Sequence, residues 1–186
     1  NELSKLIMEV MMTKFIVFLL LGFTASLGFA DDHGADMASC VESHSKLQVG
    51  SWEGEGWVAP LGAQLNKFGF SSEITEKDGM ISSNLTNSAG NKFSNSWAVG
   101  SLSRESEIGW VKEKTVTSTV ESCFEQQGVI WIRELWSGTL PDSGAKLENL
   151  VETTVSEDLL WQTLASKPSG SDMPFSVWWV NSATRK

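Results

Sequence analysis

The stretch that decides the fold reads His44-Ser-Lys-Leu-Gln-Val-Gly-Ser-Trp-Glu-Gly-Glu-Gly56. Up to Gly50, apolar residues recur at the spacing of a helix. From Trp52 onward they alternate with polar residues, as in a strand that is buried on one face. Trp52, Gly54 and Gly56 share one face of this strand, and the glycines permit a sharp bend and close approach of neighbouring backbone. Glu53 and Glu55 share the other face, which we interpret as solvent-facing rather than as a catalytic carboxylate pair.

Residues 36–50 carry the helical pattern. Asp36 can cap the first turn and Gly50 supplies a stop, so we expect a short helix of about three turns. One face of this helix collects the residues at spacings of three and four, namely Met37, Cys40, Val41, His44, Leu47 and Gln48.

Downstream, short alternating runs are separated by turn residues about every ten positions, which is typical of an antiparallel meander. We expect strands at 52–58, 68–75, 79–86, 92–99, 107–111, 115–124, 129–140, 147–155, 159–164 and 175–181. A meander of about ten strands hides its edges best by closing on itself. The prediction is an all-β protein: a closed up-and-down barrel with the short helix plugging one end.

The composition fits one globular domain. The 186 residues include nine Trp, nine Phe and no Tyr. The net charge of -9, with only 14 Lys and Arg, excludes a nucleic-acid partner, because binding to phosphates needs clustered basic residues.

The N-terminal segment resembles an export signal. Lys14 precedes an apolar run from Phe15 to Phe23, and Gly28 and Ala30 are the small residues that signal peptidase requires. The run is shorter than a membrane span, so no transmembrane anchor is expected. We interpret 1–30 as upstream residues plus a signal peptide, and 31–186 as one exported domain, periplasmic or extracellular.

The motif Gly50-x-Trp52-x-Gly54-x-Gly56 after a short helix resembles the opening strand of the calycin barrels, which include lipocalins, fatty-acid-binding proteins and nitrobindins. With His-x-x-Leu leading into Val-Gly-x-Trp, the stretch looks most like an uncharacterised family of bacterial lipocalin-like barrels. The resemblance implies that a basic residue at the end of the last strand, Arg185 or Lys186, lies over Trp52 as a structural cation–π contact.

The same resemblance argues against haem. Nitrobindins carry haem on a histidine near the C-terminus, whereas the histidines of this chain, His33 and His44, both precede the first strand. No cofactor is expected on that pattern. Two interpretations of the mature N-terminus remain. In the first, an amine on Asp31, the amides that follow and His33 supply four nitrogens to copper(II) or nickel(II). In the second, the segment is a frayed polar terminus.

Two cysteines survive signal cleavage. In an oxidising compartment Cys40 and Cys123 would form a bridge; the alternative is two buried free thiols.

Catalytic motifs such as a nucleophile elbow, a zinc-binding His-Glu-x-x-His or a P-loop are absent from the sequence. The tryptophans in the expected strands instead suggest an aromatic-lined cavity. Along 129–136, either Arg133 faces inward, where it could hold a ligand carboxylate, or Glu134 does, and periodicity leaves both open. The expected ligand-binding residues are Trp97, Trp110, Trp131, Arg133, Trp161 and Trp179.

The function that the sequence predicts is noncovalent binding of a small hydrophobic or amphipathic molecule in the barrel. Two alternatives remain open. One is an enzyme, an isomerase or hydrolase, that uses the same cavity. The other is a sealed barrel, filled by its own tryptophans, that contacts another envelope protein.

Overall fold

The structure is a computed structural model that describes residues 33–59 and 64–186, with side chains described from residue 36 onward. The expected signal peptide over 1–30 lies outside the described residues. So do Asp31, Asp32 and the side chain of His33, which make up the expected metal site. Both expectations therefore stay predictions.

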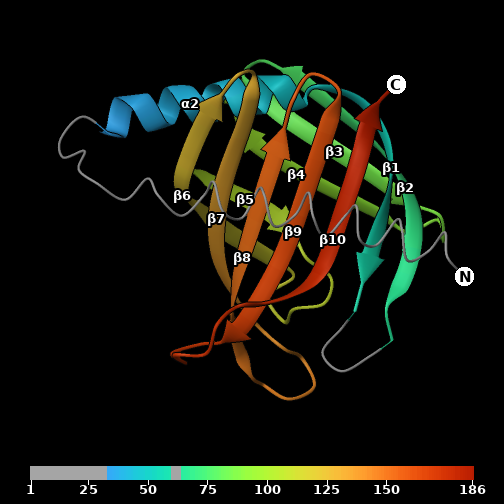
Figure 1. The fold of residues 1–186 in the computed structure, drawn as a ribbon. Coiled ribbons are helices and arrows are strands. Elements are labelled where there is room, and N and C mark those ends of the chain that lie inside the picture. The colour runs from blue at the N-terminus through green and yellow to red at the C-terminus, as the bar shows by residue number, and fades with distance from the viewer. Residues whose placement is uncertain (1–32, 60–63) are drawn as a thin grey trace, which may run out of the picture. The chain divides into compact units, whose positions relative to one another are not determined.

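One helix and ten strands form a closed antiparallel barrel in which each strand pairs with its neighbours in sequence and β1 also pairs with β10 (Figure 1). The predicted fold class is confirmed. The elements are α2 (His33–Gln48), β1 (Gly50–Val58), β2 (Asn66–Lys77), β3 (Met80–Asn87), β4 (Lys92–Ala98), β5 (Ser103–Glu107), β6 (Thr115–Gln126), β7 (Val129–Thr139), β8 (Lys146–Val155), β9 (Leu159–Pro168) and β10 (Ser176–Arg185).

Two elements differ from the sequence prediction. The helix begins at His33 rather than at Asp36, which therefore lies in the first turn instead of capping it. The prediction of a strand at 107–111 is wrong, because β5 ends at Glu107 and the residues after it form a loop. That loop is closed by a 2.6 Å hydrogen bond from the Ile108 amide to the Lys114 carbonyl, and Lys114 has a φ of 62°. A backbone with positive φ does not continue a strand.

The opening strand β1 places its two faces as alternation predicts. Trp52 is fully buried and Gly56 is buried, whereas Glu53 and Glu55 are exposed and pair on the surface with Lys186 and Lys67 at 3.0 and 2.7 Å. Gly54 lies against β10 so closely that a side chain there would collide with the Ser182 carbonyl and Ala183. The glycine motif thus permits the β1–β10 pairing that closes the barrel.

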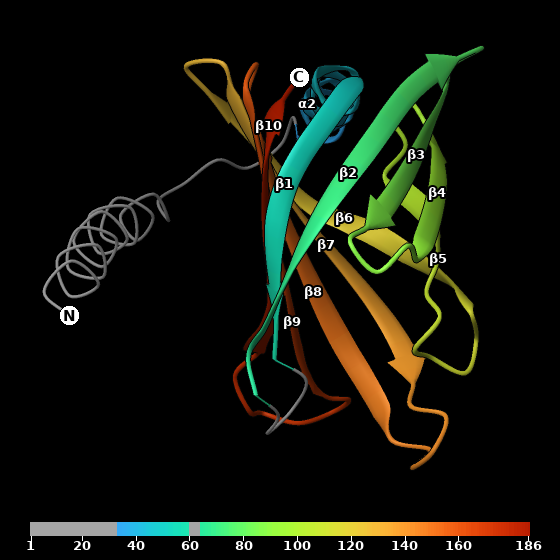
Figure 2. The same ribbon diagram turned by 90° about the vertical axis from the view of Figure 1, so that its right-hand side faces the viewer.

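The two ends of the barrel are different. Figure 2 shows α2 lying across one end, while the loops that join β7 to β8 and β9 to β10 lie at the other. We call these the helix end and the open end. Among the described residues no helix is long and apolar enough to cross a membrane.

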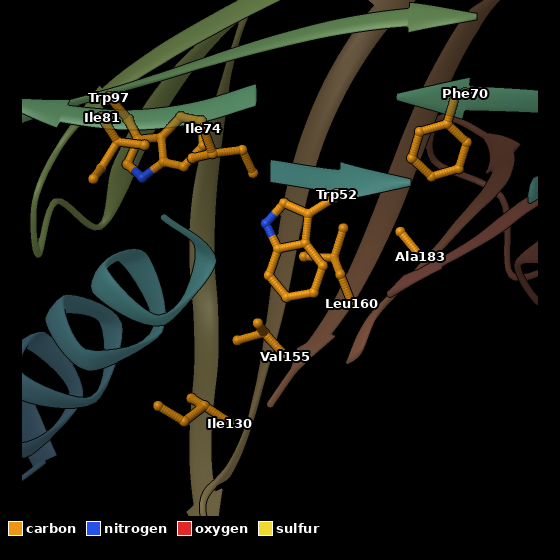
Figure 3. Packing of buried hydrophobic residues seen from close by; sticks show 9 residues of the cluster. All are labelled: Trp52, Phe70, Ile74, Ile81, Trp97, Ile130, Val155, Leu160 and Ala183. Carbon is orange, nitrogen blue, oxygen red and sulfur yellow. The ribbon is translucent and has the colours of Figure 1, made fainter. Parts of the chain in front are cut away.

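A cluster of buried hydrophobic side chains fills the helix end. Figure 3 shows the Trp52 side chain among these residues, and its indole Nε1 donates a 2.8 Å hydrogen bond to the Gln48 carbonyl at the end of α2. The cluster consists of Trp52, Phe70, Ile74, Ile81, Trp97, Ile130, Val155, Leu160 and Ala183. Because these residues come from β1, β2, β3, β4, β7, β8, β9 and β10, one core joins most of the barrel to the helix.

The helix is attached to the barrel by a disulfide and by the contacts of one arginine side chain. Cys40 of α2 and Cys123 of β6 form a disulfide with their Cα atoms 6.0 Å apart. The guanidinium of Arg185 on β10 lies 4.4 Å from the centroid of the Trp52 ring and donates hydrogen bonds to the carbonyls of Leu47, Val49 and Glu157. A positive charge at the C-terminus of α2 also complements the helix dipole.

Candidate functional site

A cavity of about 520 Å³ opens at the end of the barrel opposite the helix. It is lined by the open-end halves of the strands and by residues 108–110 of the β5–β6 loop. Its wall is largely apolar and includes six aromatic residues: Phe68, Phe93, Trp110, Trp136, Trp178 and Trp179. The volume is in the range of small-molecule sites.

Two consecutive tryptophans of β10 both reach this cavity. The register between β9 and β10 shifts between Val177 and Trp179, so that Trp178 is an extra residue in the strand. A bulge of this kind breaks the strict alternation of faces. Trp178 is held by a 2.8 Å hydrogen bond from its Nε1 to Ser166 Oγ on β9.

Trp110 enters the wall from the β5–β6 loop. Its ring packs edge-on against Trp178 at a centroid distance of 5.1 Å and lies 5.4 Å from Trp136. The loop is tied to β7 at Thr139, whose carbonyl accepts from the Lys112 amide at 2.8 Å and whose amide donates to Glu113 Oε2 at 3.0 Å. Hydrogen bonding from Thr139 lowers the pKa of Glu113, so the carboxylate that anchors the loop is the favoured form.

The floor of the cavity is polar. Glu134 of β7 and Ser118 of β6 line it, and the Ser118 hydroxyl donates to Glu134 Oε1 at 3.0 Å. Glu134 Oε2 lies 3.4 Å from Nη1 of Arg104, the first buried residue of β5. Both charged side chains are less than a tenth exposed, which makes this the buried ion pair of the described barrel.

Below the floor, buried polar groups continue towards the helix. The Arg104 guanidinium lies 5.1 Å from the Trp97 ring centroid, and Trp97 Nε1 donates to Ser45 Oγ of α2 at 3.3 Å. Nε and Nη2 of Arg104, like both ring nitrogens of His44, have no hydrogen-bond partner among the described residues. Burial, and secondarily the charge of Arg104, holds the pKa of His44 well below its usual value of 6.5, so the imidazole is neutral.

The structure separates the six residues expected to bind a ligand. Trp110 and Trp179 line the cavity. Trp97 lies inside the barrel but belongs to the helix-end cluster. Gln162 lines the cavity, and adjacent residues of a strand point to opposite faces. Trp161 therefore faces outward.

Trp131 and Arg133 also face outward, because Ile130, Ile132, Glu134 and Trp136 are the buried side of β7. Arg133 is about half exposed and pairs with Glu152 of β8 at 2.7 Å. The question left open by periodicity is thus answered: Glu134 faces the interior. A carboxylate clamp by Arg133 in this cavity does not fit the structure.

Trp136 and Trp178 were not among the residues expected to bind a ligand, and the side of Glu134 was left open. Trp136 and Glu134 are two apart on β7 and share a face with the wholly apolar Ile132, a pattern that could have indicated the inward side. Trp178 gave no such signal, because only the bulge brings it to the wall. Among the described residues, no group of three or more His, Cys, Asp or Glu could hold a metal ion.

The sequence matches no family model and no curated protein. Among solved structures, the chain is similar to Rv2717c from M. tuberculosis, with a TM-score of 0.59 and 14% identity over 81% of this chain and 99% of that one. Weaker similarities connect it to an S-type phycobiliprotein lyase from Guillardia theta (TM-score 0.42, 12% identity, 78% of this chain and 92% of that one). A DUF3598 protein of unknown function from Nostoc punctiforme is also similar (TM-score 0.31, 14% identity, 76% of this chain and 49% of that one).

At these identities the likeness bears on fold alone, and only the first similarity is close enough to carry an argument. It agrees with what the strand order shows independently. By fold, the chain is a lipocalin-like barrel of ten strands.

Proposed function

We propose that this protein is an exported binding protein that holds a small hydrophobic or amphipathic molecule noncovalently in the open-end cavity. The observation that carries the proposal is the cavity itself, about 520 Å³ in volume and walled by four tryptophans and two phenylalanines. Aromatic side chains offer large apolar contact areas to a ligand at a small cost in conformational entropy. A barrel filled by its own tryptophans would have no such volume.

The construction of the barrel supports a binding role. The disulfide and the Arg185 contacts lie outside the cavity, and the buried members of the helix-end core share only their flanking residues Phe68 and Leu85 with its wall. None of the described residues that line the cavity is a histidine, cysteine or lysine, and the proposal invokes noncovalent binding alone. Two carboxylates, Glu134 and Glu107, and a few amides and hydroxyls interrupt the apolar wall, and polar groups of this kind are typical of sites that orient a ligand.

The disulfide supports the proposed location. Disulfides form and persist in oxidising compartments, such as the periplasm and the extracellular medium, and are rare in the cytosol. Together with the signal-like segment before residue 31, the Cys40–Cys123 bridge favours export.

The test is a titration with N-phenyl-1-naphthylamine, a neutral apolar dye that becomes fluorescent in dry surroundings. We expect saturable binding at one site per chain, with quenching of tryptophan emission. Native mass spectrometry of the protein purified from its own export pathway would show whether a natural ligand occupies the same site. Absence of saturable dye binding and of any bound small molecule would overturn the proposal.

Matched variants locate the binding. Trp136 and Trp131 lie on β7 on opposite faces, so Trp136→Ala should weaken dye binding about tenfold or more while Trp131→Ala leaves it within about twofold. Val151→Trp adds bulk to the cavity wall instead of removing it, and should also abolish binding. Equal effects of the two tryptophan variants would place the dye elsewhere.

A further inference from the structure

We infer that the cavity selects amphiphiles whose polar end donates hydrogen bonds, primary amines above all, and that it discriminates against carboxylates. This inference rests on the proposed function and specifies the ligand class for the same site. It begins from the side of the Arg104–Glu134 pair that faces the cavity.

The carboxylate of Glu134 lies between the cavity and its positive partner. Glu134 lines the cavity, whereas Arg104 is not among the described residues that do so. A ligand that reaches the floor therefore meets the negative member of the pair first. The ionic contact is also a single long one of 3.4 Å, between Arg104 Nη1 and Glu134 Oε2, rather than the two-pronged arrangement that neutralises a carboxylate best.

Glu134 retains capacity to accept hydrogen bonds. An ionised carboxylate offers about four lone-pair sites. Ser118 donates to Oε1 at 3.0 Å and Arg104 approaches Oε2, which leaves at least one site on each oxygen. The side chain is only 8% exposed, so a donor that reached these sites would interact with a carboxylate largely shielded from water, where a charge-assisted hydrogen bond is stronger. A ligand amine could fill them.

The other lining residues also favour a positively charged headgroup over a negatively charged one. The charged side chains among the described lining residues are Glu134 and Glu107, and none is basic. The net charge of the whole chain, -9, adds to the negative potential. The faces of the four wall tryptophans carry negative π density, which attracts ammonium groups. A carboxylate headgroup would lose its hydration beside Glu134 and find no cation in the wall.

The experiment uses three probes with one twelve-carbon chain: dodecylamine, dodecanol and dodecanoate, each below its micelle concentration at pH 7. Each probe displaces N-phenyl-1-naphthylamine from the full mature protein. We expect dodecylamine to bind most tightly, then dodecanol, then dodecanoate, with about tenfold or more between the amine and the acid. Failure of the dye to bind would overturn the proposed function, whereas dye binding with dodecanoate as the strongest competitor would overturn only this inference.

A charge variant tests the cause. Glu134→Gln keeps the shape of the side chain but removes its charge and leaves Arg104 without an anionic partner. We expect the preference for dodecylamine over dodecanoate to disappear or reverse. Glu105→Gln, at an exposed position of β5 outside the cavity lining, should change the same ratio by less than about twofold, because solvent screens an exposed charge.

An uncompensated buried arginine is destabilising, so the single variant can fail to fold. The double variant Arg104→Gln, Glu134→Gln removes both charges and provides the second measurement. In it the ratio between amine and acid should fall towards one, while affinity for dodecanol stays within about threefold. A double variant that preserved the original ratio would show that Glu134 does not set the selectivity.

Discussion

The helix end and the open end of this barrel are built from the same ten strands and yet differ in how their interiors are filled. At the helix end Trp52 is wholly buried and its indole nitrogen is bonded to the end of α2. At the open end Trp178 and Trp179 are only partly buried and border an empty volume. The same residue type thus serves as core at one end and as cavity wall at the other.

The difference indicates that fold stability and ligand binding depend on separate parts of the molecule. The disulfide, the Arg185 contacts and the larger hydrophobic cluster all lie at the helix end. The cavity wall at the open end is held by a smaller cluster around Trp136 and by the hydrogen bond of Trp178 to Ser166. Changes at the helix end should therefore alter unfolding without altering ligand affinity, and the predictions below test that separation.

The largest effect is expected from the disulfide. Replacing both cysteines, Cys40→Ser with Cys123→Ser, frees a loop of 83 residues in the unfolded chain and should lower the free energy of unfolding by roughly 4 to 5 kcal/mol. Urea unfolding with fluorescence detection measures this. Under conditions where the variant is folded, its affinity for N-phenyl-1-naphthylamine should stay within about twofold; a larger loss would show that the two ends are coupled.

Arg185 comes next. Arg185→Gln removes the cation over Trp52 and the hydrogen bonds to the Leu47 and Val49 carbonyls, and should cost about 2 to 3 kcal/mol of unfolding free energy. Lys186→Gln is the matched control. Its partner Glu53 is on the surface, so the expected change is below about 0.5 kcal/mol. Equal losses in the two variants would contradict the role assigned to Arg185.

Acid should weaken the helix end through His44. Its pKa is lower in the folded protein than the ordinary 6.5, so between the two values the unfolded chain binds the extra proton. The stabilisation is complete above about pH 6.5 and declines as the pH falls, by about 1.4 kcal/mol per pH unit. Comparing wild type with His44→Gln between pH 7 and 5.5 measures it. A slope that the substitution leaves unchanged would assign the effect to other groups.

The smallest effect is expected at the open end, from the tie between the Trp110 loop and β7. Glu113→Gln weakens the acceptor for the Thr139 amide and should lower dye affinity by about two- to threefold. Because the pKa of Glu113 is lowered by folding, the tie is present at neutral pH and is lost as the pH falls through that lowered value. Glu125→Gln, at the far end of β6, is the control and should leave the affinity unchanged.

Much of the architecture could be predicted from local pattern. The motif around Trp52 signalled the change from helix to strand, and alternation with turn residues located nine of the ten strands, because burial on one face imposes a period of two. The exception, β5, is short and polar on both faces, as Arg104 and Glu105 show, so its pattern carried no period to detect.

The site was less predictable for two physical reasons. On β7 both faces carry an aromatic and a charged residue, and the usual expectation that charge faces solvent fails for Glu134, which is buried because Arg104 of another strand compensates it. That partner is distant in sequence. At Trp178 a bulge changes the parity of the strand, and a single sequence gives no direct sign of it.

The closing pair of strands has a consequence for the order of folding. Trp52 on β1 stands opposite Arg185 on β10, so the barrel is closed by the strand pairing that spans the longest stretch of the described chain. Contacts of such sequence separation form slowly, because loop-closure entropy is lost before they stabilise anything. A chain in which only β1 to β9 have formed still has two unpaired strand edges and lacks the contacts of Arg185 with the end of the helix. Closure must therefore wait until β10 is available to pair with β1, which makes this pairing the step that completes the native barrel.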